Sequence, residues 1–482
     1  MNLHIHESQH SRRDFLKQSA LGAGALGLAG PQAFAASGYE APPATADAII
    51  CIWLPGGVDQ IDTWDPKKHT PFEKGMKGSE LLSTVPKIPT SADGIFLGQG
   101  LEHIAKVMDK GTILRTLTSD TKFGAIHLKA QHYVKTGYEF PAFVQVPSFG
   151  SMVARTLGPK NPNVPAYIDI GRDVTTADEE MVFISQYMGP GFLGVKYAPF
   201  MIPNPTEGIS TLNAVSDMNP ERLDRRQDYL RAISGQAPEA VLESNKTQDY
   251  MSVMERARNM MDSPVKRAFK LEEEPESVRK TYDVGHRFGL SCLLARRLVE
   301  EGARYIEVEY QYAPFAGFDT HENGATRMQA MKQQIDRPIG TLIKELDERG
   351  LLERTLVVVM SEFGRTIADQ PQAGTEEFGF DESQTGDSLV VDDMRLYGHH
   401  GHFSSCQSIL FFGGGFKQGY VHGKTADRHP MEPIENPVKL IDTYATLYSA
   451  LGISPDTYYT VEDRPFFVTK DGKGKVVNDL LA

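Results

Sequence analysis

Short apolar segments alternate with amphipathic helical segments through much of this 482-residue chain. Residues 46–54 (ADAIICIWL) form an apolar, β-branched run, which is typical of a strand buried on both faces of a sheet. Further strands are expected at 111–117, 304–310, 355–360 and 408–412, and helices at 100–108, 127–136, 290–301, 328–350 and 437–452. Strands that alternate with helices predict an α/β fold, with a mostly parallel central sheet and helices on both of its faces.

The charge balance and the cysteine content exclude several classes of protein. The chain has 50 Lys and Arg against 63 Asp and Glu, a net charge of −13, which argues against coating nucleic acid. Cys51, Cys292 and Cys406 are too few for a disulfide scaffold or a multi-thiolate metal module, so we expect buried, inert thiols. No segment has 18 consecutive apolar residues, and no membrane span is expected.

Residues 1–35 are predicted to be a twin-arginine signal peptide. Arg12 and Arg13 lie in the sequence SRRDFLK, an apolar stretch follows, and Ala33-Phe34-Ala35 forms a small-x-small cleavage site before Ala36. The G-x-G-x-x-G match at 22–27 lies inside this leader without a preceding strand, so it is not interpreted as a nucleotide site. The twin-arginine export machinery is therefore the expected partner, and the expected location is periplasmic or extracellular.

The remaining residues, 36–482, are expected to form one α/β domain with an insertion. Residues 138–215 are rich in Pro, Gly and aromatic residues and are interpreted as loops and short strands. Residues 216–285 are strongly charged with helical spacing and are predicted to be an inserted helical subdomain. Residues 369–393 have the composition of an acidic surface loop.

Acidic and imidazole side chains recur next to the predicted strands. Ligands of open α/β sheets bind beyond the carboxyl ends of the strands. The residues at those positions are Asp59, Asp62 and Asp65, then Asp319, His321 and Glu322, then Glu362 and Arg365, and before the last strand His399, His400 and His402. Singly, each has a plain structural alternative, such as a turn, a helix cap or a local salt bridge. Together they predict a divalent metal site, in which Zn, Ca, Mg and Mn are not distinguished.

Several motifs resemble a known family. Residues 336–364, a helix, Gly-Leu and a strand, and the helix at 436–454 resemble the sulfatase and alkaline-phosphatase superfamily. Gly-Gly-x-x-x-x-Asp-Thr-Trp-Asp-Pro-Lys at 56–67, Phe-Asp-Thr-His at 318–321 and Ser-Glu-Phe-Gly-Arg-Thr at 361–366 are more specific. With the leader, they resemble the domain of unknown function 1501 family, a twin-arginine-exported branch of that superfamily.

The resemblance implies an alkaline-phosphatase-like fold and a one- or two-metal site. The metal ligands it implies are Asp62, Asp319, His321, Glu362 and His402, with His400 as an additional candidate. Phe363 stands where the superfamily has a further ligand His. Lys129 and Arg365 are candidates to bind the oxyanion of the substrate.

His127 lies where the superfamily has its nucleophile, at the start of an eleven-residue stretch that ends in Thr136-Gly137. A histidine can be phosphorylated, act as a base or bind the metal, so these roles stay open. Thr118, Ser119 and Thr121 are rival nucleophiles just upstream.

Two functions are compatible with these residues. The first is an exported metal-dependent hydrolase of phosphate or sulfate esters. The second is a non-catalytic secreted binding or assembly protein on a degenerate hydrolase scaffold, which the missing hydroxyl at His127 and the Phe at 363 favour. The sequence does not identify the substrate of the first.

Overall fold

The computed structural model describes residues 34–35, 42–119, 126–139, 145–172, 189–207, isolated positions between 221 and 232, then 258–260, 263–311, 316–367, 389–461 and 464–482. The predicted leader lies almost wholly outside these residues, so export stays a prediction. None of the described helices is long and apolar enough to cross a membrane.

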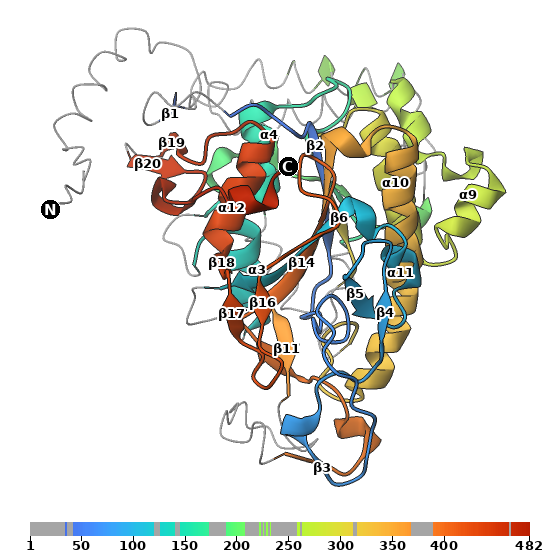
Figure 1. Cartoon of the computed structure of the whole chain (residues 1–482). Coiled ribbons are helices and arrows are strands. Elements are labelled where there is room, and N and C mark those ends of the chain that lie inside the picture. Colours follow the sequence, from blue (N-terminus) through green and yellow to red (C-terminus); the bar gives the residue numbers. More distant parts are fainter. Residues whose placement is uncertain are drawn as a thin grey trace, which may run out of the picture.

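A nine-stranded sheet forms the centre of the molecule (Figure 1). Its order is β15-β6-β14-β10-β2-β9-β7-β8, with β18 beside β6. The strands are β2 (Ala48–Trp53), β6 (Gly111–Thr118), β7 (Tyr167–Ile170), β8 (Phe200–Ile202), β9 (Tyr305–Glu309), β10 (Thr355–Met360), β14 (Gln407–Phe412), β15 (Tyr420–His422) and β18 (Val438–Lys439). β14 runs antiparallel to both β6 and β10, and the other pairings in this sheet are parallel. The prediction of a mostly parallel sheet is therefore confirmed.

Helices cover both faces of this sheet because its strands are apolar on both sides. In β2 and just after it, Ile50, Ile52 and Leu54 enter one hydrophobic cluster, whereas Ile49, Cys51 and Trp53 enter the other. The first cluster packs against α2 (Glu102–Ala105), α10 (Arg287–Glu300) and α11 (Gly324–Glu348). The second packs against α3 (His127–Thr136), α4 (Phe149–Leu157) and α12 (Leu440–Ala450). Figure 1 shows α10 and α11 on one side of the sheet and α4 and α12 on the other.

Short antiparallel strand pairs lie outside the central sheet. They are β3 (Met76–Lys77) with β12 (Val390–Val391), β4 (Lys87–Pro89) with β5 (Phe96–Gly98), β11 (Gly364–Thr366) with β13 (Gly401–Phe403), β16 (Lys424–Thr425) with β17 (Pro433–Glu435), and β19 (Thr457–Val461) with β20 (Arg464–Phe467). β1 (Phe34–Ala35) adds an antiparallel partner to β19. The pair β11–β13 sets Arg365 opposite His402.

Three expectations about single elements were wrong in extent. The helix expected at 100–108 is reduced to α2, because Leu101 and Val107, which flank it, have φ near −120°. The helix expected from 437 begins at Leu440, because Val438 and Lys439 extend the sheet beside β6. The region 138–215 was expected to hold loops and short strands; its described part has the short strands β7 and β8, which belong to the central sheet, and also the helix α4, which was not expected.

The predicted helical insertion at 216–285 lies mostly outside the described residues. Its described part contains two 3₁₀ segments, Pro264–Phe269 and Leu271–Glu273, and the short helix α9 (Glu276–Thr281). Phe269 and Tyr282 are buried in the core beneath α10. The bounds of a separate insertion therefore stay a prediction, as does the acidic loop at 369–393.

Candidate metal centre

The predicted site residues come from segments that meet at one edge of the sheet. β2, β6, β9 and β10 end at this edge, because they run in the same direction. Asp319 follows β9, Glu362 lies two residues after the end of β10, and His127 begins α3 after β6. β14 runs the other way, so His402, which precedes it, arrives at the same edge.

Asp319 is the point at which four of these side chains meet. Its Oδ1 lies 2.8 Å from Nε2 of His321, 3.1 Å from Nε2 of His127 and 3.7 Å from Nε2 of His402. The His127 and His402 rings are 4.4 Å apart between centroids, and those of His321 and His402 are 5.0 Å apart. One ligand atom from each of the four residues lies within 4.8 Å of the others.

Three imidazoles and one carboxylate form a donor set that suits a divalent metal. Zn²⁺ is bound by His nitrogens and carboxylate oxygens at about 2.0–2.2 Å, usually with four ligands. Asp319 is 2% exposed, whereas 21% of the His321 side chain is exposed, so the cluster reaches solvent on the His321 side. The residues present therefore fit a metal that is bound in a largely buried site with one accessible flank.

Glu362 approaches the cluster from the far side of His127. Its Oε1 is 2.8 Å from Nδ1 of His127 and accepts hydrogen bonds from the Gly56 backbone N–H at 2.8 Å and the Gln131 amide at 3.3 Å. The Ser361 hydroxyl is 3.0 Å from Oε2. The structure thus places Glu362 behind His127, outside the four-residue cluster, whereas the sequence interpretation made it a metal ligand.

Arg365 forms a buried ion pair with Asp319, and none of the Arg365 side chain is exposed. Its Nη2 donates to Oδ1 of Asp319 at 2.7 Å. Its other N–H groups donate to the backbone oxygens of Gly56, Gly57, Thr320 and His400. A guanidinium has five N–H groups, and these contacts occupy all five. In this arrangement Arg365 has no donor left for a substrate oxyanion, so the structure lends no support to the role that the sequence predicted.

The turn after β2 fits closely against the cluster. A Cβ on Gly56 would come within 2.5 Å of the Asp319 backbone nitrogen, and one on Gly57 within 2.5 Å of the Phe363 ring. Both glycines also have positive φ, 112° and 83°, which other residues rarely adopt. The centroid of the Phe363 ring lies 4.9 Å from that of His127 and 4.5 Å from that of His402, so this ring forms an apolar wall beside the two imidazoles.

Burial and hydrogen bonding set the charges in the cluster. Burial alone would lower the pKa of His127, but the hydrogen bonds to Asp319 and Glu362 raise it to about 9. Burial alone would raise the pKa of Asp319, but the hydrogen bonds from His127, His321 and His402 hold it far below its usual range. Without metal, a proton on His127 thus links two carboxylates.

Asp62 and His400 lie outside this cluster. Asp62 belongs to a second buried group with Asp59 and His399, and its carboxylate accepts hydrogen bonds from the Thr84 backbone and hydroxyl. His399 Nδ1 is 2.7 Å from Asp59 Oδ2. His400 Nε2 accepts the Gly324 backbone N–H at 2.9 Å, and burial lowers its pKa to about 3, so it is neutral.

The sequence also predicted roles for Lys129, Thr118 and Thr121. Lys129 is half-buried on α3, and its proposed contact with substrate is untested. Thr118 donates its hydroxyl to the Val438 backbone at the end of β6, and Thr121 lies outside the described residues. Gln131 was not among the predicted site residues, although its position one helical turn after His127 places both on one face of a helix.

Residues 46–481 match the family described as "Protein of unknown function (DUF1501)". The chain belongs to the DUF1501 family. No curated protein matches it in sequence.

Solved structures of the sulfatase and alkaline phosphatase superfamily are similar to this chain, at low identity. PsFucS1 sulfatase from Pseudoalteromonas sp. is 13% identical, with a TM-score of 0.35, over 89% of this chain and 73% of that one. An alkaline phosphatase from the Antarctic bacterium TAB5 is 12% identical, with a TM-score of 0.32, over 78% and 94%. A Vibrio parahaemolyticus protein in the alkaline phosphatase superfamily is 9% identical, with a TM-score of 0.38, over 91% and 72%. At these values the likeness says nothing about the activity of the DUF1501 chain.

Proposed function

We propose that this DUF1501 protein is an exported metal-dependent hydrolase of phosphate or sulfate esters. The observation that carries the proposal is the convergence of His127, Asp319, His321 and His402 at the carboxyl edge of a mostly parallel sheet. Such edges are where α/β proteins bind their ligands. Three imidazoles favour Zn²⁺ over Mg²⁺ or Ca²⁺, which prefer oxygen ligands.

In this proposal His127, Asp319, His321 and His402 hold the metal, which supplies Lewis-acid polarisation of the ester and activation of water. Glu362 accepts the Nδ1 proton of His127 and fixes the ring so that Nε2 faces Asp319. Arg365 keeps the Asp319 carboxylate in place and ionised. Phe363 excludes water from one flank of the imidazoles, and His321 marks the flank open to substrate.

His127 has two possible tasks, and one variant separates them. If its Nε2 is a metal ligand, His127→Ala should lose most of the bound metal, because each ligand contributes strongly to affinity. If it is instead the nucleophile or base, the variant should keep its metal and lose activity. Metal analysis of purified protein, followed by a screen of phosphate and sulfate esters, measures both quantities.

A second function, a non-catalytic secreted binding protein, is favoured by one observation. All five N–H donors of Arg365, the buried cation that contacts Asp319, form hydrogen bonds within the protein itself. In hydrolysis, a positive clamp on the developing charge is usually the largest single contribution. If fully metal-loaded wild type hydrolyses none of the esters, the hydrolase proposal is rejected and this second function is retained.

A further inference from the structure

A polar stripe runs along the face of α3 that meets the sheet. His127, Gln131 and Lys135 are spaced four residues apart, so they lie above one another on one side of the helix. All three are buried, at 8%, 1% and 7% exposure. His127 and Gln131 contact Glu362, whereas Lys135 contacts Glu307 and Glu309 in β9.

Lys135 enters a buried network of charges that the proposed reaction does not use. Its Nζ pairs with Glu307 and lies 3.2 Å from Glu309. Arg172 lies 3.0 Å from Glu307, 2.9 Å from Glu309 and 2.6 Å from Asp169. Burial raises the pKa of Asp169 to about 7, so below neutral pH two cations face two carboxylates and one protonated acid. The network is thus balanced, and removing Lys135 alone would leave a buried negative charge.

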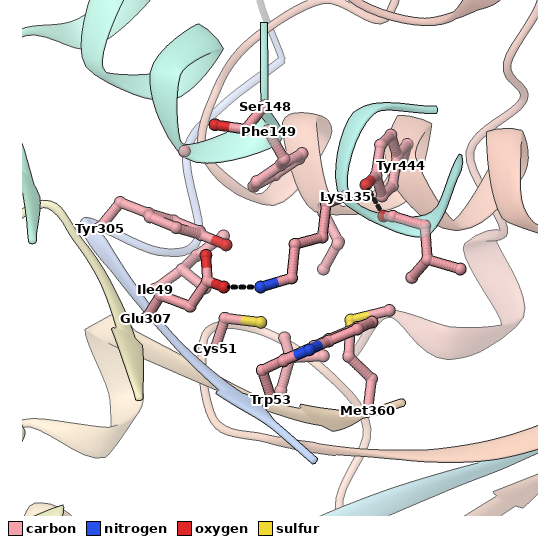
Figure 2. Close-up of a pocket in the computed structure, with 14 residues that line it drawn as sticks. Ile49, Cys51, Trp53, Lys135, Ser148, Phe149, Tyr305, Glu307, Met360 and Tyr444 are labelled. Atoms are coloured by element: carbon pink, nitrogen blue, oxygen red, sulfur yellow. Dashed lines mark hydrogen bonds and ion pairs between the residues drawn. The ribbon is translucent and has the colours of Figure 1, made fainter. Parts of the chain in front are cut away.

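The surroundings of Lys135 fix its position closely. Figure 2 shows its side chain reaching from α3 to Glu307, between Phe149 and Trp53. The ammonium lies 4.5 Å from the Trp53 ring centroid, and the adjoining cavity of about 30 Å³ leaves room for little more than water. The ion pair therefore holds α3 against β9 at a defined depth.

The first turn of α3 is held in place by side-chain hydrogen bonds and ion pairs between this helix and the rest of the protein. Ile126 occupies the N-cap position and provides no side-chain hydrogen bond to the helix. Caps normally satisfy the free N–H groups of a first turn and stabilise it. Here His127, the first helical residue, is held by Glu362 and Asp319, and the next polar contacts on its face are Gln131 and Lys135.

We propose that Lys135 is a positioning residue, whose pairing with Glu307 and Glu309 sets α3 so that the His127 ring lies between Asp319 and Glu362. The inference deepens the proposed function, because it assumes that His127 belongs to a metal site. Lys135 acts through the helix and touches neither metal nor substrate.

The test uses the full chain with the charge network kept in balance. Lys135→Met alone leaves Glu307 and Glu309 to share the single cation Arg172 and risks unfolding, so the main variant is Lys135→Met with Glu309→Gln. A control on the opposite face of the sheet is Arg296→Met with Glu345→Gln, which removes buried Arg296 of α10 together with one of its three carboxylate partners, partly buried Glu345 of α11. Lys135→Arg keeps the charge and serves as the rescue variant.

The first readout is Zn²⁺ affinity, measured by competition with a chromophoric chelator. We expect the Lys135 double variant to bind Zn²⁺ more than about twofold more weakly, but by less than the about 10–100-fold that follows loss of a direct hydrogen-bond partner of a metal ligand, because Lys135 acts through the helix. The Arg296 control should stay within about twofold of wild type, because distant sites act independently. Lys135→Arg should recover most of the affinity. A double variant that binds Zn²⁺ as tightly as wild type would overturn the inference.

The second readout, amide hydrogen exchange of residues 127–136 without metal, does not depend on the proposed function. We expect faster exchange in the Lys135 double variant than in wild type or the Arg296 control. Unchanged exchange would also overturn the inference. If wild type binds no Zn²⁺, or Asp319→Asn binds it equally well, the proposed metal site fails, and exchange alone decides whether Lys135 anchors α3.

Discussion

Arg365 connects the turn after β2, the Asp319 segment and the segment that carries His402. Its guanidinium donates to four backbone carbonyls and to Asp319, all in the interior.

We expect Arg365→Lys to lower the free energy of unfolding by about 2–5 kcal/mol, because three donors cannot replace five and each buried unpaired group costs about 1–3 kcal/mol. Urea denaturation of metal-free protein measures this loss. Arg395→Lys, in an exposed pair with Asp393, is the control and should change stability by less than about 0.5 kcal/mol. Equal stability of the two variants would contradict the structural role of Arg365.

The sequence was a better guide to which residues come near the candidate site than to the role of each residue there. Asp319, Glu362 and His402 were expected near one another because each follows or precedes a predicted strand, and parallel strands bring such ends to one edge of the sheet. Their roles depend on side-chain geometry that spacing does not encode. Asp62 was expected in the metal site, but the path of the loop after β2 carries it to Thr84 and away from Asp319.

At the scale of elements, α3 is stabilised by buried polar residues that respond to pH. His132 is 2% exposed, and its Nδ1 lies 3.0 Å from the Tyr138 carbonyl oxygen. Burial lowers the pKa of His132 to about 4, below the value of about 6.5 in an unfolded chain. Between these values only the unfolded chain takes up a proton, so stability is lost as pH falls, by about 1.4 kcal/mol per pH unit.

We therefore expect His132→Gln to flatten this dependence. Between pH 6.5 and 4.5, wild type should lose about 2–3 kcal/mol more unfolding free energy than the variant. Urea denaturation at pH 6.5, 5.5 and 4.5 measures the difference. Parallel curves for the two proteins would show that His132 carries a proton in the folded state.

Long, regular elements were predictable, and short ones were not. β10 was placed at its observed bounds, because five consecutive apolar residues, from Leu356 to Met360, come shortly after a helix and the glycine that follows it. β7 and β8 escaped notice because they have only four and three residues, and Asp169 interrupts the apolar pattern of β7. A strand this short is fixed by pairing with β9 rather than by its own sequence.

At the scale of the whole molecule, the three cysteines lie in the interior of the fold. Cys51 is in β2, Cys292 in α10 and Cys406 just before β14, and all three are buried and free. Burial raises the pKa of Cys51 to about 12 and those of the other two still higher. Because the thiolate is the reactive form, we expect no rapid reaction of native protein with Ellman's reagent at pH 8 and three thiols in denaturant. One thiol that reacts rapidly in the native protein would contradict the described packing.

The whole fold must be assembled before a metal can bind, because His127 and His402 come from opposite halves of the chain. The proposed metal is best loaded where the chain folds, and the folded protein is then exported, which is what the predicted twin-arginine leader implies. We expect Arg12→Lys with Arg13→Lys to leave uncleaved precursor in the cytoplasm, since recognition depends on the arginine pair. Cell fractionation with immunoblotting measures this, and metal analysis of the retained precursor should find it loaded. The usual amount of processed protein outside the inner membrane would show that another route exports the chain.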